Sequence, residues 1–522
     1  GMLSHTITGI GDGDAFDNST ALNASLVTDD QRAGLYIFGQ NRHRSAYDHD
    51  GDGYSEIPKL HGQTIGFRSF LKTTTYSKLT FEYHHMEEFR RGGDLLNRPP
   101  HEANVAEQTE HSINGGGLKF DYFSPNENHR FNVFASAQHI NRDSYYGPGD
   151  RDPLDAYGNT TDLNWMAGSQ YVYSFGKCIF MPSDLTAGIE FNQDKLEDNM
   201  WGYNRTVDQK VNIGSAFLQN EWKNDHWGFL IGGRLDKHNL IDHVIFSPRA
   251  NLRYNPTENI NLRFSYSSGF RAPQAFDEDL HVENVGGNVA MVELADNLKE
   301  ERSQSLSASA DIYHRFGAFQ VNFLVEGFYT KLSDVFALTD GEVVDGILTR
   351  TRHNASGAQV LGLTLEGKMA YLNKIQVQAG VTLQQSHYSK PHIWNKEAPA
   401  VKKMMRTPNT YGYFTATYTP IKPLSIALSG TYTGSMLVPH EPVPGFLENP
   451  ITVNTKDFFD IGLKAAYDFK LYKSMNLQLN AGIQNIFNAY QDDFDKGADR
   501  DSGYIYGPSL PRSFFAGVKI SY

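Results

Sequence analysis

Apolar and polar residues alternate along most of the chain. In the segment 259–267 every second side chain is apolar, and asparagine, arginine and serine stand between them. The segments 375–383 and 459–469 repeat this alternation. Successive side chains of a β-strand point to opposite faces, whereas helical side chains return to one face about every 3.6 residues. The pattern therefore predicts an all-β protein whose strands have one apolar and one polar face.

Strand length separates two architectures that accept this pattern. In a soluble sandwich the apolar faces pack inward and strands run about 5–6 residues. In an outer-membrane barrel the apolar face meets lipid, the polar face lines a lumen, and strands run about 9–11 residues. The alternating runs here are long, and Arg263, Lys464 and Asp468 lie on the polar face. These features favour a transmembrane antiparallel β-barrel.

The connections between the alternating segments support the same architecture. Short turns such as 124–129 and 255–259 alternate with long loops such as 274–299 and 391–409. Short turns at one end and long loops at the other are typical of bacterial outer-membrane barrels. We count about 22 strands in one domain that covers residues 1–522. Because every backbone group in lipid needs a partner, the first strand is expected to pair with the last, 512–522.

Composition and motifs narrow the functional classes. The 522 residues carry a formal net charge of −13, which disfavours nucleic acid as a partner. The single cysteine, Cys178, excludes an internal disulfide and a cysteine-based zinc cluster. The chain has no Gly-x-Ser-x-Gly, His-Glu-x-x-His or phosphate-binding Gly-Lys-Ser/Thr motif. We therefore expect no enzymatic activity.

Several segments, taken in order, resemble one family. They are FSYSSGFRAPQAFDEDLH (264–281), DNLKEERSQS (296–305), RTPNTYGYFTATYTP (406–420), AGIQNIFNAYQDD (481–493) and GPSLPRSFFAGVKISY (507–522). Together they resemble the barrel of the TonB-dependent receptors, which are 22-stranded active transporters of the bacterial outer membrane. The style of the loops is most similar to that of members from Bacteroidetes.

The resemblance implies uptake of a scarce solute across the outer membrane. The expected cargo is a metal chelate such as a siderophore, haem, or a vitamin such as cobalamin. The expected partners are outer-membrane lipids, a small-molecule ligand, a plug domain and the TonB energy-coupling complex, and the barrel is expected to be a monomer. Neither a plug nor a TonB box is recognisable in this chain. The alternatives are a passive pore without a plug, a structural barrel, and a surface receptor for a protein partner.

One short loop carries a candidate metal site. Asp48, Asp50 and Asp52 alternate with Gly51 and Gly53, and Glu56 follows, as in the first half of a calcium-binding EF-hand loop. Position 12 of such a loop would be Lys59 rather than glutamate, so an EF-hand is excluded. We expect the loop to connect the third and fourth strands, where it either binds calcium or forms a solvated acidic tip. No other cofactor is expected, and the acidic stretches 147–152 and 492–501 are interpreted as solvated tips.

Other side chains are candidates for ligand binding. Arg271 can bind an anionic ligand or brace the barrel wall, and His281 follows it in a region where haem receptors of the family place an iron ligand. Lys402, Lys403 and Arg406 form a small basic patch. Loop aromatic residues can stack on a planar ligand or anchor the barrel at the membrane interface; these are Tyr145, Tyr146, Trp201, Tyr203 and Trp394.

Overall fold

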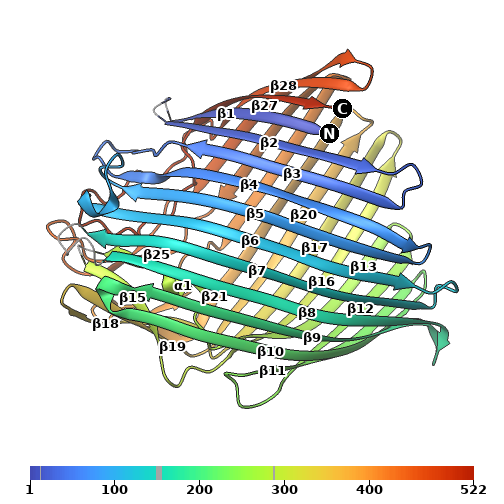
Figure 1. Ribbon diagram of the computed structural model, residues 1–522, viewed down its shortest axis with the longest axis horizontal. Helices are drawn as coiled ribbons and strands as arrows, with labels where there is room; N and C mark the ends of the chain where they lie inside the picture. Colours follow the sequence, from blue (N-terminus) through green and yellow to red (C-terminus); the bar gives the residue numbers. More distant parts are fainter. Residues whose placement is uncertain (12, 14, 149–155, 286–287) are drawn as a thin grey trace.

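The computed structural model describes residues 1–11, 13, 15–148, 156–285 and 288–522, and they form one closed antiparallel β-barrel (Figure 1). Twenty-two strands make the wall, as the sequence predicted. They are β1 (Met2–Ile10), β2 (Ala15–Val27), β3 (Ala33–Arg44), β4 (Ser55–Thr74), β5 (Ser77–Gly93), β6 (Val105–Phe123), β7 (His129–Pro148), β8 (Tyr157–Cys178), β9 (Met181–Met200), β10 (Arg205–Lys223), β11 (Trp227–His238), β12 (Ile245–Thr257), β13 (Ile260–Arg271), β16 (Glu301–Phe316), β17 (Phe319–Ser333), β20 (Ala358–Tyr371), β21 (Ile375–His392), β23 (Thr410–Ile421), β24 (Leu424–Thr433), β27 (Phe458–Tyr472), β28 (Met475–Gln484) and β29 (Ser513–Ser521).

The barrel closes between its first and last strands. β1 pairs with β29 in antiparallel register, with Met2 opposite Ser521 and Ile10 opposite Ser513. The backbone N–H of Tyr522 donates to the carbonyl of Gly1, and the two termini lie side by side in Figure 1. Closure leaves no open sheet edge in the described part of the wall, which satisfies the predicted need to pair every backbone group in lipid.

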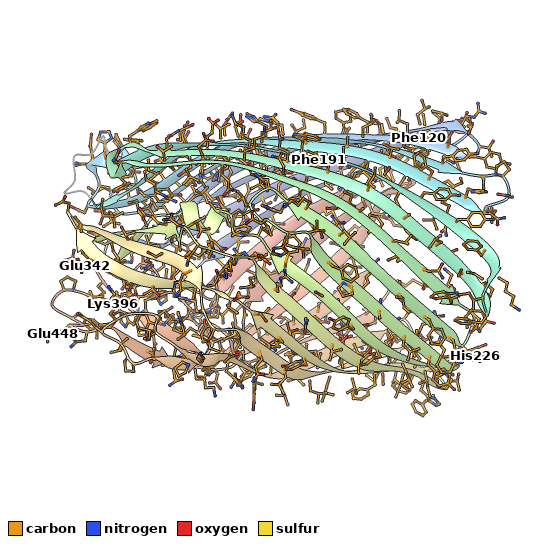
Figure 2. All side chains as sticks on the ribbon, turned by 90° about the horizontal axis from the view of Figure 1, so that it is seen from below. Phe120, Phe191, His226, Glu342, Lys396 and Glu448 are labelled. Atoms are coloured by element: carbon orange, nitrogen blue, oxygen red, sulfur yellow. The ribbon has the colours of Figure 1, made fainter. Side chains whose placement is uncertain are left out.

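The remaining elements lie among the long loops. β14 (Glu283–Val285), β15 (Asn288–Leu294), β19 (Ile347–Asn354) and β18 (Phe336–Val344) form a four-stranded sheet, and β25 (Leu437–His440) pairs with β26 (Ile451–Asn454). Figure 2 shows Glu342, Lys396 and Glu448 at this long-loop end and His226 at the short-turn end. Within the described residues, no helix is long and apolar enough to cross a membrane. Further small elements in the described part of the chain include α1 (Asp277–Leu280), β22 (Val401–Lys403) and the 3-10 turns Pro100–Glu102 and Trp201–Tyr203.

The two faces of the wall differ in chemistry, as the alternation predicted. Phe264 is 48% exposed on the outer face, and Figure 2 shows Phe120 on the outer surface of the barrel. Along β6, Leu118 is exposed on the outer face, but Ser112, on the same face nearer the long loops, is polar. β8 has 22 residues, about twice what a bilayer requires. This part of the wall therefore extends beyond the apolar belt at the long-loop end.

The buried side chains gather at the long-loop end rather than in a central core. The largest apolar cluster joins the tops of β6, β7 and β9 to the loop 272–300 through Ala106, Tyr146, Met200, Val282 and Val289. The lumen itself is lined by polar side chains, so hydrophobic burial is concentrated where the loops fold against the wall. The long loops are thus packed structures that shape the mouth of the barrel.

Candidate functional site

Arg350 joins four of the long loops. Its guanidinium lies 2.6 Å from Glu283, 3.0 Å from Asp340 and 3.3 Å from Glu441. Asn395 donates to the same Asp340 and Glu441 carboxylates, at 3.1 Å in each case. The Arg350 side chain is only 14% exposed. This buried ion cluster fixes the loops 272–300, 334–357, 393–409 and 434–457 to one another.

The loop 485–512 attaches to the same cluster. The backbone N–H of Glu441 donates to Asp501 at 3.0 Å, and His440 lies 3.0 Å from Asp495. The ring of His440 stacks on Tyr504 with centroids 3.8 Å apart. Burial, the Asp340 charge and Asp501 outweigh the Arg350 charge and raise the pKa of Glu441 to about 7. The mouth thus contains a buried carboxylate that is half protonated near neutral pH.

The acidic helix α1 is held by arginines from the wall and from the small sheet. Arg142 of β7 lies 2.8 Å from Asp277, and Arg205 of β10 donates to the carbonyls of Asp279 and Leu280. Arg352 of β19 pairs with Asp279 and lies 3.2 Å from Glu278. Although α1 has four residues, these contacts position it against the inner wall.

A partly enclosed cavity of about 240 Å³ lies between the wall and these loops. Its wall side comes from the tops of β4, β5, β6 and β7, and its loop side from Val282, Glu283, Val289 and the segment 494–505. Glu107, Arg90, Arg500 and Asp501 line it together with aromatic rings, including that of Tyr146. Cavities that enclose whole drug-sized ligands measure about 300–1,000 Å³, so this cavity suits one arm of a larger solute.

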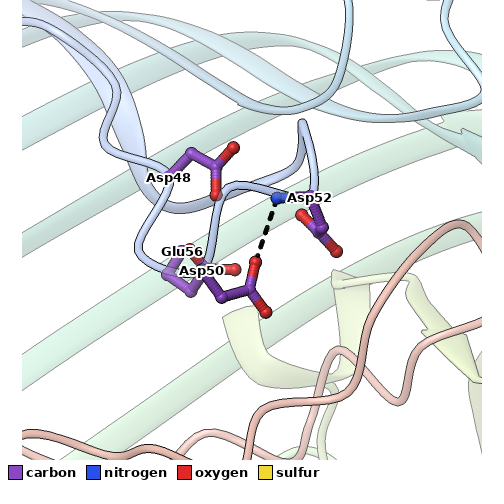
Figure 3. Close-up of side chains that lie close together, drawn as sticks. All are labelled: Asp48, Asp50, Asp52 and Glu56. Carbon is purple, nitrogen blue, oxygen red and sulfur yellow. Dashed lines mark hydrogen bonds between the residues drawn. The ribbon is translucent and has the colours of Figure 1, made fainter.

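The four acidic residues of the candidate metal loop converge as the sequence predicted. The loop connects β3 and β4, and one carboxylate oxygen from each of Asp48, Asp50, Asp52 and Glu56 lies within 4.8 Å of the others (Figure 3). Asp48 accepts from the N–H groups of Gly51 and Gly53, and Asp50 accepts from Asp52 N–H at 3.2 Å. These bonds curl the loop so that its carboxylates face inward.

Arg500, which lies 444 positions after Glu56, neutralises much of this cluster. Its guanidinium pairs with Asp52 and lies 2.9 Å from Glu56, while Lys496 lies 3.5 Å from Asp50. Burial opposes the ionisation of Asp52, but hydrogen bonds from Gly497 and Tyr54 N–H and the Arg500 charge outweigh it and lower the pKa of Asp52. The acidic loop is therefore docked on the loop 485–512.

This docking corrects the interpretation of 492–501 as a solvated tip. Asp495 and Asp501 are each 6% exposed, and they bind the ring of His440 and the backbone N–H of Glu441, respectively, from another loop. For the other stretch interpreted in this way, 147–152, residues 149–152 lie outside the described residues.

Arg271 and His281 occupy the two ends of the segment that contains α1. Arg271 pairs with Glu278, and its guanidinium lies 4.1 Å from the ring centroid of Phe276. His281 lies 3.9 Å from Glu107, and its ring packs edge-on against Tyr146 at 5.2 Å. The structure thus brings His281 and Tyr146 together beside the cavity, while Arg271 braces the loop.

Most of the candidate aromatic residues are buried at the long-loop end, and Tyr145 and Tyr146 lie at the end of β7 rather than in a loop. Tyr145, Tyr146 and Tyr203 are at most 5% exposed and belong to the apolar cluster that holds the loop 272–300. Trp394 is 6% exposed, whereas Trp201 is 63% exposed. The alternative assignment to a membrane-interface belt is therefore wrong for the four buried rings. In the basic patch, Arg406 donates to the carbonyls of Ile505 and Gly503.

Sequence reasoning did not single out the residues that organise the mouth, Arg350, Glu441, Arg500 and Asp501. Arg350 and Glu441 lie in loops without a repeating pattern. Arg500 and Asp501 lie in a stretch of charged residues, and this density of charge was the one available signal.

Comparison with known families identifies the chain. Residues 6–486 match the family model described as "TonB dependent receptor-like, beta-barrel". The protein belongs to the TonB-dependent receptor family. None of the curated proteins compared with this receptor matches it.

Solved structures share the fold of this receptor. The siderophore receptor PirA of Acinetobacter baumannii is 15% identical with a TM-score of 0.77, and the match covers 100% of this chain and 80% of PirA. A mutant of the ferric enterobactin receptor PfeA of Pseudomonas aeruginosa is 14% identical with a TM-score of 0.75, again over 100% and 80% of the chains. The ferric-catecholate import receptor Fiu of E. coli K12 is 13% identical with a TM-score of 0.72, over 100% and 81%.

Calcium binding by the acidic loop stays a prediction, and Arg500 sets its expected strength. A calcium ion prefers several oxygen ligands, and two of the four carboxylates already bind the guanidinium. We expect Arg500→Gln to bind calcium at least about tenfold more tightly than the unaltered receptor, because it frees Asp52 and Glu56. Calorimetric titration of calcium measures this, with Arg512→Gln as the control. If calcium bound neither to the unaltered receptor nor to Arg500→Gln, the hypothesis of a calcium site would be wrong.

Proposed function

We propose that the receptor imports a scarce solute, in the first instance a ferric chelate of the siderophore type, across the outer membrane of a bacterium. The observation that carries this proposal is a barrel of the TonB-dependent receptor family whose mouth holds a cavity under interlocked loops. The long loops would face the cell exterior, and the short turns would face the periplasm. Haem and cobalamin remain the alternative cargoes.

Partners follow from the same proposal. The apolar outer belt would contact outer-membrane lipids, and a plug domain would occupy the lumen and connect the barrel to the TonB energy-coupling complex. The barrel would act as a monomer, because one chain closes the whole sheet. Its role would be binding and transport, without catalysis. Membership of the Bacteroidetes group stays a prediction.

Uptake of radioactive iron tests the proposal. A strain that lacks the gene is expected to lose uptake of at least one ferric chelate, and the native gene is expected to restore it. Because transport would be energised through TonB, an uncoupler of the inner-membrane proton gradient should abolish the restored uptake. A passive pore would instead give uptake that the uncoupler does not affect and a steady conductance in planar bilayers. Uptake that is unchanged in the deletion strain for every ferric chelate would contradict iron import.

A further inference from the structure

The charges that line the mouth cavity are predominantly negative. The cavity contacts five carboxylates and two arginines; the carboxylates are Glu56, Glu107, Glu283, Asp495 and Asp501. The cavity also takes residues from the three loops 45–54, 272–300 and 485–512. With histidine not counted, the loop 45–54 contains three acidic and no basic residues, and the loop 272–300 contains seven acidic residues and one basic residue. The loop 485–512 contains five acidic and three basic residues. Because a cleft lined by one sign of charge focuses its field on an entering solute, this mouth repels anions.

Both arginines of the cavity are already paired. Arg500 is bound by Asp52 and Glu56, and its side chain is 13% exposed. Arg90 lies 2.6 Å from Glu88. An anionic ligand beside either guanidinium would lie next to the carboxylates already paired with it, and repulsion by these carboxylates offsets much of the attraction. Among the described residues, the cavity therefore offers no unpaired arginine or lysine to a negatively charged solute.

Three of the carboxylates have no lysine or arginine partner among the described residues: Asp495, which pairs with His440, Asp501 and Glu107. Asp501 accepts hydrogen bonds from the N–H groups of Glu441 and Gly503, and among the described residues no lysine or arginine forms an ion pair with it. Glu107, whose side chain is 56% exposed, lies 3.9 Å from His281. Burial raises the pKa of Asp501, so a cation placed beside it would relieve an unfavourable charge. The rings of Tyr146 and Phe494, which also line the cavity, add faces that attract cations.

We propose that this cavity receives a protonated amine or guanidinium arm of the transported solute, so that the cargo is a cationic chelate rather than an anionic tricatecholate. Glu107 and Asp501 would bind the cationic nitrogen, and the volume of about 240 Å³ accommodates an alkylammonium chain but not a whole ferric chelate. This inference rests on the proposed function, because it assigns the charge of the cargo that the receptor would import.

The direct test uses two ferric chelates of opposite charge and the full chain in detergent. Ferrioxamine B, a trihydroxamate with a free ammonium group, is expected to bind more tightly than ferric enterobactin, a trianionic tricatecholate. The double variant Glu107→Gln with Asp501→Asn is expected to weaken ferrioxamine B binding about tenfold or more, because two charges that face the ammonium group are removed. The control is Asp499→Asn, an exposed aspartate of the same loop, which should change nothing.

A second pair of probes separates this inference from the proposed function. 1,5-Diaminopentane and glutarate have the same carbon chain and opposite charges, and a shift in melting temperature reports their binding without iron. Stabilisation by the diamine alone, lost in the double variant, supports the cavity assignment even if neither chelate binds. Iron import is tested separately by uptake in the deletion strain, and its failure there would leave this assignment of the cavity standing. Tighter binding of ferric enterobactin, equal binding of the two small probes, or no effect of the diamine would overturn the inference and leave import open.

Discussion

Replacement of Arg350 by methionine is expected to release the loops from the mouth while the barrel stays folded. The change leaves the buried Asp340 and Glu441 and the partly exposed Glu283 without their shared cation. Removal of one partner of a buried ion pair destabilises proteins by about 3–5 kcal/mol, because the remaining charges lose their compensation. Hydrogen exchange measured by mass spectrometry should show this loss as faster exchange in the loops 272–300 and 434–457, with the strands of the wall unchanged.

An exposed arginine provides the matched control. Arg32 lies at the short-turn end, is 71% exposed and stands 3.9 Å from Asp30. Because exposed ion pairs contribute little to stability, Arg32→Met should leave exchange in every loop unchanged. If the loops kept their protection in Arg350→Met, the ion cluster would not be what holds the mouth together.

The wall of the barrel was predictable because its physics is local. Apolar and polar side chains alternate along each strand, as in Ile260 to Tyr266, and lipid imposes this pattern on the part of the wall that forms the apolar belt. The turns 124–129 and 255–259 mark the short-turn end, and the need to pair every backbone group led to the closure of β1 on β29. No knowledge of distant contacts was necessary for these predictions.

The mouth was less predictable because its contacts join distant parts of the chain. The spacing of Asp48, Asp50 and Asp52 indicated convergent carboxylates, and the structure confirms that they converge. Nothing in that spacing points to Arg500, whose pairing depends on how two loops fold over the lumen. In the same way, an exposed tyrosine and a buried one look alike in sequence, so the burial of Tyr146 at the end of β7 could not be inferred.

Protonation of Glu441 is expected to make the docking of the loops pH-dependent. Its side chain is surrounded by Asp340, Asp501, Arg350 and Asn395, and its pKa is raised from 4.5 to about 7. A carboxyl whose pKa is higher in the docked state favours docking when protonated. This stabilisation is complete below about pH 4.5 and is lost as the pH rises through 7. The shift corresponds to about 3 kcal/mol of docking free energy.

Glu441→Gln is therefore expected to protect the loops at high pH. Glutamine keeps an oxygen that can accept from Asn395 and Arg350 but carries no charge, so it resembles the protonated glutamate. At pH 8 the loop 434–457 should exchange more slowly in the variant than in the unaltered receptor, because the free energy of loop opening is greater by up to about 3 kcal/mol. At pH 5 the two proteins should exchange alike. Glu448→Gln, at an exposed position of the same loop, should retain the pH dependence of the unaltered receptor. A pH dependence that persisted in Glu441→Gln would assign it to another group, of which Asp501, also buried and with a raised pKa, is the first to examine.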